Sequence, residues 1–333
     1  MRKLRFGVLG AAKIAREKVI PPLQRAGRCE VVALASRDAA RGQEVAAKLG
    51  IARVHDSYEA LLADPDIDAV YNPLPNHLHV PWTIKAAEAG KHVLCEKPLG
   101  LNAAEVEALI AVRDRTGVQI QEAFMVRTHP QWLRAHEVVH SGRLGELKVI
   151  SGQFSYYLVD PANVRNVAEW GGGGLLDIGC YPITTSRLIT GREPTRVAAL
   201  IERDPTTGID RLGSALLDFG PVQCCFQYGT QLVPRQTMQF LGTKARLEVE
   251  IPFNAPNDAP TRLHLYAGPG LGLTAVETIE LPVCDQYGVM GDAFAASIQD
   301  GTPQPVPLEN SVANMRVVDA VFRAAERGTW ETP

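Results

Sequence analysis

The first third of the chain alternates short apolar runs with stretches of helical periodicity. Apolar runs cover Leu4–Leu9, Glu30–Ala35 and Asp68–Asn72, and each has the length of a buried strand. Between such runs apolar positions recur at helical spacing, for example over Ala39–Leu49 and Ala103–Thr116. Alternating strands and helices predict an α/β unit built on a doubly wound parallel sheet.

After about residue 124 the pattern changes, because candidate strands follow one another with few helices between them. The alternation over Gln153–Tyr156 and the tight link Phe219–Val222 predict a large, mostly antiparallel open sheet. We therefore expect an α/β domain over 1–123 and an α+β domain over 124–333, whose last helix can pack back on the first domain. The candidate strands of the second domain are Leu147–Tyr157, Thr195–Ile201, Arg211–Phe219, Val222–Tyr228, Gln236–Leu241, Ala245–Glu250, Leu263–Ala267 and Thr278–Leu281.

Composition narrows the class of protein. A length of 333 residues suits two domains, and a net charge of −3 without a basic run gives no sign of a nucleic-acid partner. No apolar stretch reaches the roughly 20 residues of a membrane helix, and Met1–Phe6 runs straight into a strand pattern instead of a signal peptide. The 6 cysteines are scattered and form no C-x-x-C, which is typical of reduced thiols. We expect a soluble cytoplasmic protein.

A tight glycine turn and a helical pattern follow the first apolar run. The turn reads G-x-A-x-x-A, with Gly10, Ala12 and Ala15 in the glycine positions of a dinucleotide fingerprint. Gly10 permits the turn, and Ala15 is small enough for close helix–strand contact. The helix N-terminus around Lys13 and Ile14 offers amides to a pyrophosphate. Taken alone, the motif fits a structural strand–helix turn equally well.

The tip of the second strand indicates which dinucleotide would bind. NAD sites usually carry an acidic residue there, whereas this strand ends in Ser36 and Arg37. A hydroxyl and a guanidinium suit the 2′-phosphate of NADP, and Arg41 either adds a second cation or lies on a solvated helix face. Asp38 favours NAD to a smaller degree. The balance favours NADP.

The strand that ends at residue 72 is followed by a stiff, proline-rich loop. In an open parallel sheet such loops face the ligand, so Pro73, Leu74, Asn76, His77 and His79 become candidate cofactor neighbours. A metal site at the two histidines is not expected, because no carboxylate or cysteine cluster supports it.

A further apolar run closes on Glu96, Lys97 and Pro98. A lysine at this strand end faces the expected cofactor, and the proline restricts its approach. The plain alternative is a surface Glu–Lys pair at a strand end. Whether the Lys97–Pro98 bond is cis stays open, although a tight turn makes it plausible.

Four glycines at 171–174 precede a segment with candidate chemistry in the second domain. If a helix starts near Leu175, then Asp177 and Tyr181 stand four apart on one face. A carboxylate, a phenol and a separate lysine suit proton transfer at a hydroxyl or carbonyl, because a nearby ammonium stabilises a phenolate. The alternative is a helix-capping Asp and a core Tyr.

In this order the glycine turn, N-P-L-P-N-H, C-E-K-P and G-G-G-x-L-x-D-I-G-C-Y resemble the Gfo/Idh/MocA oxidoreductase family over essentially the whole chain. The resemblance implies an N-terminal NADP-binding Rossmann domain and a C-terminal substrate-binding domain whose sheet forms a homodimer or a higher homo-oligomer. Tyr181 and the triplet ending at Arg165 are similar to the subgroup of glucose–fructose oxidoreductase, NADP-dependent xylose dehydrogenase and dimeric dihydrodiol dehydrogenase.

The resemblance also implies the site residues. It makes Lys97, Asp177 and Tyr181 catalytic, and it adds Arg165 to these three for substrate binding. Ala12 departs from the middle glycine of the fingerprint, and the N-terminal export signal and arm of glucose–fructose oxidoreductase are absent, so ordinary cofactor exchange is expected. The residues expected to bind NADP are Gly10, Ala12, Lys13, Ile14, Ser36, Arg37, Arg41, Pro73, Leu74, Asn76, His79, Glu96 and Lys97.

The main hypothesis is an NADP-dependent oxidoreductase that passes a hydride between nicotinamide and a carbon of a sugar, polyol or cyclic alcohol. Acid–base duty stays open between Lys97 and Tyr181. One alternative is an NADPH-dependent reductase of dicarbonyls or anhydro-sugars. A second is a non-catalytic NADP-binding sensor, which would be expected to have lost Lys97, Asp177 or Tyr181, whereas all three are present.

Overall fold

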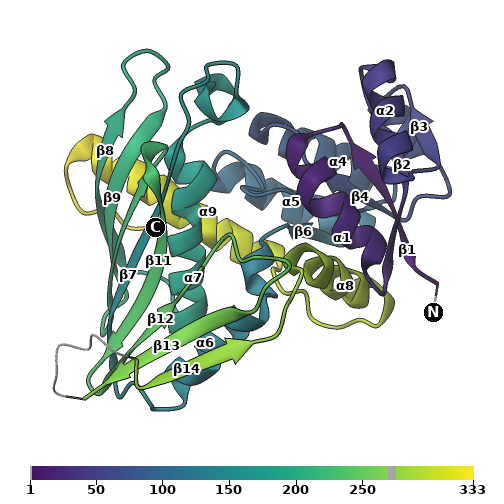
Figure 1. The fold of residues 1–333 in the computed structure, drawn as a ribbon. Helices are drawn as coiled ribbons and strands as arrows, with labels where there is room; N and C mark the ends of the chain where they lie inside the picture. Colours follow the sequence, from purple (N-terminus) through teal and green to yellow (C-terminus); the bar gives the residue numbers. More distant parts are fainter. Residues whose placement is uncertain (1, 269–274) are drawn as a thin grey trace. The chain divides into compact units, whose positions relative to one another are not determined.

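The computed structural model describes residues 2–268 and 275–333, and the chain divides into two compact units. Unit 1 comprises Met1–Met125 and Asp285–Val312, and unit 2 comprises Val126–Cys284 and Ala313–Pro333. Each unit is built around a sheet of its own (Figure 1).

A parallel sheet with the strand order β3-β2-β1-β4-β5-β6 forms the centre of unit 1. The direction of winding reverses at β1, which lies between β2 and β4, as in a doubly wound sheet. The strands are β1 (Leu4–Leu9), β2 (Cys29–Ala35), β3 (Arg53–His55), β4 (Ala69–Asn72), β5 (His92–Cys95) and β6 (Ile120–Glu122).

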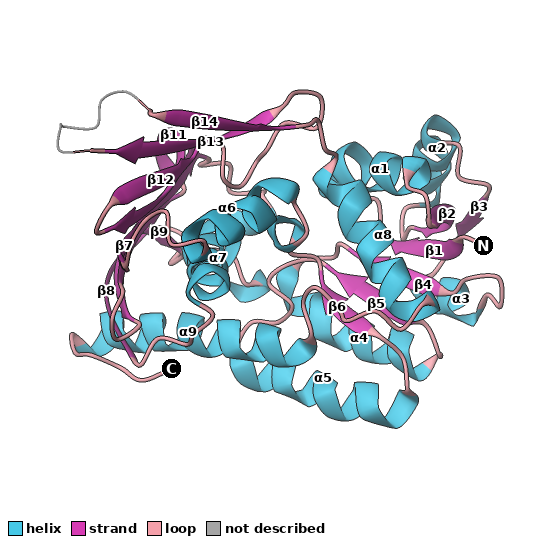
Figure 2. Ribbon diagram, turned by 90° about the horizontal axis from the view of Figure 1, so that it is seen from below, coloured by secondary structure: helices cyan, strands magenta, loops and turns pink. Residues whose placement is uncertain are grey.

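Helices cover both faces of this sheet, with α1 and α8 on one side and α3, α4 and α5 on the other (Figure 2). Successive residues of β1 show the alternation: the Phe6 ring lies 6.2 Å from the Phe294 ring, whereas a Cβ at Gly7 would meet Leu61 at 2.8 Å. The helical segments of this unit are η1 (Ala15–Val19), α1 (Ile20–Arg25), α2 (Ala39–Leu49), α3 (Tyr58–Ala63), η2 (Asn76–Leu78), α4 (His79–Glu88), α5 (Ala103–Thr116) and α8 (Gln286–Gln299).

An open sheet with the order β14-β13-β12-β11-β7-β10-β9-β8 dominates unit 2. Neighbouring strands are antiparallel except for β7 and β10, which run parallel. The strands are β7 (Leu147–Tyr157), β8 (Arg196–Arg203), β9 (Asp210–Asp218), β10 (Gln223–Gly229), β11 (Gln231–Gly242), β12 (Ala245–Val249), β13 (Thr261–Ala267) and β14 (Glu277–Leu281). The other helical segments of the chain are η3 (Met125–Arg127), α6 (Pro130–His140), η4 (Val164–Asn166), η5 (Ala168–Trp170), η6 (Leu175–Gly179), α7 (Cys180–Thr190) and α9 (Leu308–Arg327).

The core of unit 2 lies where α6 and α7 pack against one face of the open sheet (Figure 2). Trp132 of α6 is fully buried, its Nε1 donates to the Pro252 carbonyl at 2.8 Å, and its ring meets Phe240 edge-on at 6.2 Å. On the opposite face, Leu200 and Leu216 are 78% and 49% exposed. The sheet therefore buries one face within the unit and leaves apolar side chains on the other.

The structure confirms the predicted fold class, because a parallel Rossmann sheet is joined by a second, mostly antiparallel sheet. The largest difference in a strand of the second sheet is at β11, which begins at Gln231 instead of Gln236, and β13 begins at Thr261 instead of Leu263. The ladder with β7 tolerates Pro234 through an irregularity in register between Gln231 and Arg235.

Candidate functional site

The turn after β1 has the geometry that the fingerprint requires. Gly10 has a φ of +82°, which favours glycine, and its amide donates to the Ala35 carbonyl at 2.8 Å. A Cβ at this position would lie 3.3 Å from Leu74, so the turn is also closely packed. The chain then enters a helical segment at Lys13, whose side chain is exposed. Amides of this first turn have no partner within the helix and can meet an anion.

Three charged side chains follow β2, and they have different surroundings: Asp38 bonds to the backbone, whereas Arg37 and Arg41 are exposed. Asp38 is the N-cap of α2 and accepts from the Arg41 amide at 3.0 Å, and Ser36 is buried with its Oγ accepting from the Asp38 amide at 3.3 Å. Arg37 and Arg41 are exposed, and within 2–268 and 275–333 no acidic side chain pairs with either. The Asp38 carboxylate thus caps α2, whereas the side chains of Arg37 and Arg41 face solvent.

The buried side-chain amide of Asn72 holds the loop after β4 through two hydrogen bonds to its backbone. Asn72 donates to the His79 carbonyl at 3.1 Å and accepts from the Leu74 amide at 3.3 Å. Pro73 and Leu74 are consequently buried, whereas Asn76 opens a short helical turn and is half-buried. The loop is a fixed surface with few exposed polar groups of its own.

His79 lies inside this loop. The ring is 1% exposed, with Nδ1 2.7 Å from the Pro98 carbonyl and Nε2 2.6 Å from the Leu74 carbonyl. Burial lowers the pKa of His79 to about 4. Both ring nitrogens of His79 therefore face backbone carbonyls.

The segment after β5 presents Lys97 on a rigid support. Lys97 is half-buried, and the Lys97–Pro98 peptide bond is cis. Glu96 accepts from the Tyr71 hydroxyl at 2.6 Å, and burial together with this carboxylate raises the pKa of Tyr71 well above its usual value. The phenol therefore stays protonated and keeps donating to Glu96.

Buried Glu122 fixes the residue after the cis bond. Its Oε1 accepts from the Leu99 amide at 3.0 Å, and its Oε2 accepts from the Ser311 hydroxyl at 2.8 Å. The strand tips of β5 and β6 are thereby joined to the start of α9. The sequence offered no signal for this contact, because residues 99, 122 and 311 are far apart along the chain.

In unit 2, the glycine run is shaped by Asp210. A Cβ at Gly173, whose φ is +123°, would collide with the Asp210 carboxylate, and Asp210 Oδ2 accepts from the Leu175 amide at 2.6 Å. Burial raises the pKa of Asp210 to about 6. The predicted helix does start at Leu175, and its first turn is a π-helix that carries Asp177.

Asp177 is held by two donors to one oxygen. Its Oδ2 accepts from the Tyr156 hydroxyl at 2.6 Å and from Arg165 Nε at 2.8 Å. The Asp177 charge raises the pKa of Arg165 above its usual value, and burial followed by the same charge raises that of Tyr156. The structure thus brings Arg165 and Asp177 into contact. The sequence analysis missed Tyr156, although the alternation of β7 could have placed it on the face of Phe154.

Tyr181 lies in the first turn of α7 and is buried among aromatic rings. Its ring meets Phe154 edge-on at 5.6 Å and lies 5.2 Å from Phe253. These contacts fix the orientation of the phenol ring.

Family models match both units. The model described as oxidoreductase family, NAD-binding Rossmann fold, covers residues 4–124, and the GFO/IDH/MocA C-terminal domain covers 132–248. The chain belongs to the GFO/IDH/MocA family of oxidoreductases. The predicted resemblance is therefore confirmed.

Proteins similar to this chain include a sugar dehydrogenase, a 3-ketoreductase and an aldose–aldose oxidoreductase. The chain is 40% identical over 330 residues to D-xylose 1-dehydrogenase (NADP(+)) 2 of Haloferax volcanii, covering 97% of this chain and 98% of the relative. A 3-ketoreductase from Actinomadura kijaniata in complex with NADP and TDP-benzene is 32% identical, with a TM-score of 0.90 over 97% of this chain and 98% of that one. Aldose–aldose oxidoreductase from Caulobacter crescentus, complexed with glycerol, is 25% identical with a TM-score of 0.89 over 100% of both chains.

The dinucleotide that the GFO/IDH/MocA fold implies fits the residues present. The closely packed glycine turn, the open amides that follow it and the two exposed guanidinium groups supply a donor set for phosphates. These donors lie at the carboxyl ends of β1 and β2, where ligands bind in open parallel sheets.

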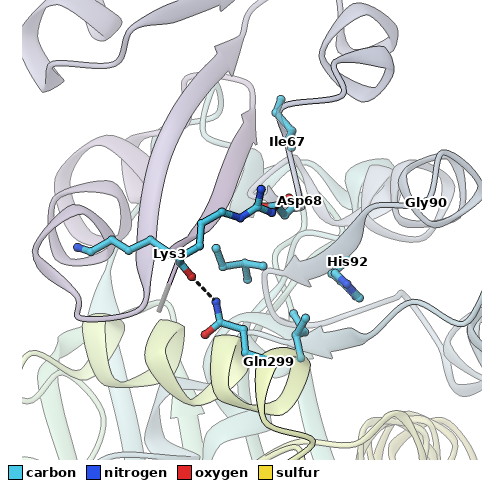
Figure 3. Close-up of a pocket in the computed structure, with 9 residues that line it drawn as sticks. Lys3, Ile67, Asp68, Gly90, His92 and Gln299 are labelled. Carbon is cyan, nitrogen blue, oxygen red and sulfur yellow. Dashed lines mark hydrogen bonds and ion pairs between the residues drawn. The ribbon is translucent and has the colours of Figure 1, made fainter.

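A hollow of about 540 Å³ lies at the other edge of the same sheet (Figure 3). Asp68, at this edge, pairs with Arg2 at 2.7 Å, and Gln299 donates to the Arg2 carbonyl at 2.9 Å. Because this edge holds the amino ends of the strands, the hollow is separate from the candidate cofactor residues. Its lining residues are Arg2, Lys3, Leu4, Ile67, Asp68, Gly90, His92, Ile298 and Gln299.

The described residues contain no group of three or more His, Cys, Asp or Glu side chains arranged to hold a metal ion. None of the helices over 2–268 and 275–333 is long and apolar enough to cross a membrane.

Proposed function

We propose that this chain catalyses NADP-dependent oxidation of a CH–OH group in a sugar, polyol or related cyclic alcohol, and the reverse reduction. The observation that carries the choice of NADP is the β2 tip, where Asp38 caps α2 while Arg37 and Arg41 stay exposed. The xylose dehydrogenase relative is named for NADP, and the 3-ketoreductase structure contains it. Both findings support the same cofactor.

The nicotinamide of NADP supplies the carbon that exchanges a hydride with the substrate. We propose that Gly10, Ala12, Lys13 and Ile14 line its pyrophosphate through backbone amides. Other cofactor contacts are assigned by position at the strand tips and bind ribose, 2′-phosphate or nicotinamide. These residues are Ser36, Arg37, Arg41, Pro73, Leu74, Asn76, Glu96 and Lys97, with His79 acting through the loop that it supports.

We propose that Lys97 or Tyr181 accepts the hydroxyl proton of the substrate. When the alcohol is oxidised, its O–H proton must leave as its C–H hydride departs, and a positioned neutral amine or phenolate accepts it. The residues on both sides of Lys97 are held by other elements of unit 1, and the Tyr181 ring is fixed by Phe154 and Phe253. The same groups return the proton during reduction.

We assign substrate orientation to Asp177 and Arg165. Tyr156 and Arg165 both donate to one oxygen of Asp177, which gives this carboxylate a defined direction. A carboxylate held in this direction accepts a hydrogen bond from a sugar hydroxyl. Arg165, 43% exposed at its side chain, offers its remaining N–H groups to the same substrate.

The quaternary state and location belong to the same proposal. We propose a cytoplasmic homodimer that forms through the sheet of unit 2, where Leu200 and Leu216 are exposed on the face away from α6 and α7. In this proposal unit 1 binds the cofactor and unit 2 supplies substrate contacts and the dimer interface.

The deciding experiment is an initial-rate assay with NADP against aldoses, inositols and cyclic diols, repeated with NADPH against keto-sugars, dicarbonyls and anhydro-sugars. Turnover of one carbohydrate class, with NADP preferred over NAD, supports the proposal. Faster reduction than oxidation would favour the reductase alternative, which the 3-ketoreductase relative supports. NADPH binding without turnover of any compound would contradict an enzymatic role.

A further inference from the structure

The residues on both sides of Lys97 are held by other elements of unit 1. A strand, a helix and a second strand each contribute one side chain to this support. The contacts are Tyr71 Oη with Glu96 Oε1 at 2.6 Å, His79 Nδ1 with the Pro98 carbonyl at 2.7 Å, and Glu122 Oε1 with the Leu99 amide at 3.0 Å.

Among these contacts His79 is distinct because it reaches two loops at once. Its Nδ1 faces Pro98 of the loop after β5, and its Nε2 faces Leu74 of the loop after β4 at 2.6 Å. The backbone of His79 is held in turn, since its carbonyl accepts from the fully buried Asn72 amide at 3.1 Å. One buried ring therefore connects the ends of two neighbouring strands.

We propose that His79 is a positioning residue that ties the loop after β4 to the loop after β5 and thereby fixes the direction of Lys97. The inference rests on the proposed catalytic role of Lys97. It places His79 outside direct contact with cofactor or substrate.

The chemistry of the ring suits this role. Burial lowers the pKa of His79 to about 4, the two carbonyls raise it, and the charges of Lys97 and His77 lower it. Burial therefore favours a neutral ring at pH 7, and a neutral ring donates to one of the two carbonyls. Removing the ring takes the partner away from two backbone carbonyls and opens a void between the loops.

Loss of this support should act on the chemical step. A shift of about 1 Å in a reacting group can cost on the order of a hundredfold in rate. The KM values for substrate and cofactor should change little, because the residues that bind them are not removed.

The test compares His79→Ala, His79→Gln and the control His92→Ala. Gln keeps N–H donors near the two carbonyls. His92 lies at the opposite end of β5 and accepts from the Gln119 amide at 2.9 Å, so its removal perturbs the same strand away from Lys97. We expect His79→Ala to lower kcat on the order of a hundredfold with KM for substrate and NADP within about threefold, and His79→Gln to recover most of kcat. His92→Ala should lower stability and leave kcat unchanged.

Amide hydrogen exchange supplies a readout that does not need turnover. In His79→Ala, the Leu99 amide should exchange at least about tenfold faster relative to the Val93 amide inside β5, because only the loop loses its support. If the wild-type protein turns over no substrate, the proposed function fails, and the exchange ratio alone decides on His79.

Two results would overturn the inference. One is an unchanged kcat in His79→Ala. The other is equal acceleration of exchange at Leu99 and Val93, which would show that the ring contributes general stability only.

Discussion

Some side chains at the strand tips form hydrogen bonds with the backbone, and others are exposed to solvent. Asp38 and Ser36 both bond to backbone amides, whereas Arg37 and Arg41 extend into solvent. His79 and Glu122 are buried against the backbone around Lys97, which itself is half-buried. At this scale the proposed function depends on the residues that face outward.

Arg37→Ala with Arg41→Ala tests the cofactor assignment. A charge-assisted hydrogen bond contributes about 1.5–3 kcal/mol, so loss of two cations should raise KM for NADP at least about tenfold and leave KM for NAD nearly unchanged. Steady-state kinetics with both cofactors measures the change. Lys48→Ala, exposed in the last turn of α2, is the matched control and should alter neither value. Equal losses for NADP and NAD would refute the 2′-phosphate role.

Lys97→Met tests the catalytic assignment. Removing an acid–base or orienting ammonium typically costs about 10²–10⁴-fold in kcat, while the dissociation constant of NADPH should stay within a few-fold. Rates and fluorescence titration measure the two quantities. Lys85→Met, on exposed α4 surface beside Glu59, serves as the control. Wild-type activity in Lys97→Met would remove Lys97 from the mechanism.

At the scale of elements, the glycine run and the π-turn of Leu175–Gly179 depend on one buried carboxylate. Asp210 accepts the Leu175 amide, and the missing side chain at Gly173 gives it room. Because η6 carries Asp177, the position of the Asp210 carboxylate determines where Asp177 lies.

The raised pKa of Asp210 predicts a pH dependence of stability. The pKa of Asp210 is about 6 in the folded state against an ordinary value of 3.8, so the folded state binds more protons between about pH 4 and pH 6. Stability from this group therefore falls as pH rises through that window, by up to about 3 kcal/mol. Asp210→Asn retains an acceptor for Leu175, and its free energy of unfolding, measured in urea, should show a shallower fall. An unchanged pH slope would contradict the assignment.

Local patterns in the sequence predicted these elements well. Strand ends at Leu9, Ala35, Asn72 and Cys95 follow from apolar runs that close on glycine, serine, proline and glutamate, and all four agree with the structure. The helix start at Leu175 follows from the glycines before it. Such features depend on neighbours in the chain, and periodicity reports them directly.

Contacts between distant residues were not accessible in the same way. Tyr156 with Asp177, Glu122 with Leu99, and Asp210 with Leu175 join separate elements, so no local spacing encodes them. The orientation of His79 was missed for a related reason, because a histidine in a loop carries no sign of whether its ring points inward. The cis Lys97–Pro98 bond was left open by the sequence and is present.

At the scale of the whole molecule, one face of the sheet of unit 2 exposes large apolar side chains. Leu216 lies beside Cys225 on β10 and Ala198 on β8, and Leu200 lies further along β8, so apolar side chains gather on adjacent strands. Exposed apolar patches of this kind often mark association surfaces.

Leu200→Arg combined with Leu216→Arg should therefore convert a dimer to a monomer. Each arginine would bury a charge without a partner in the interface, which is strongly unfavourable. Sedimentation velocity measures the state, and Leu133→Arg on exposed α6 surface is the control. A dimer that survives the double change would place the interface elsewhere, and a monomeric wild-type protein would contradict the homodimer proposal.

The most direct test of the central claim follows one hydrogen atom. The best substrate of the panel is prepared with deuterium on the carbon that is oxidised, and the NADPH formed is analysed by mass spectrometry. The proposed function predicts NADPH that carries one deuterium, a slower rate with the labelled substrate, and loss of both signals in Lys97→Met. Unlabelled NADPH, or oxidation without NADPH formation, would contradict hydride transfer between this cofactor and a CH–OH carbon.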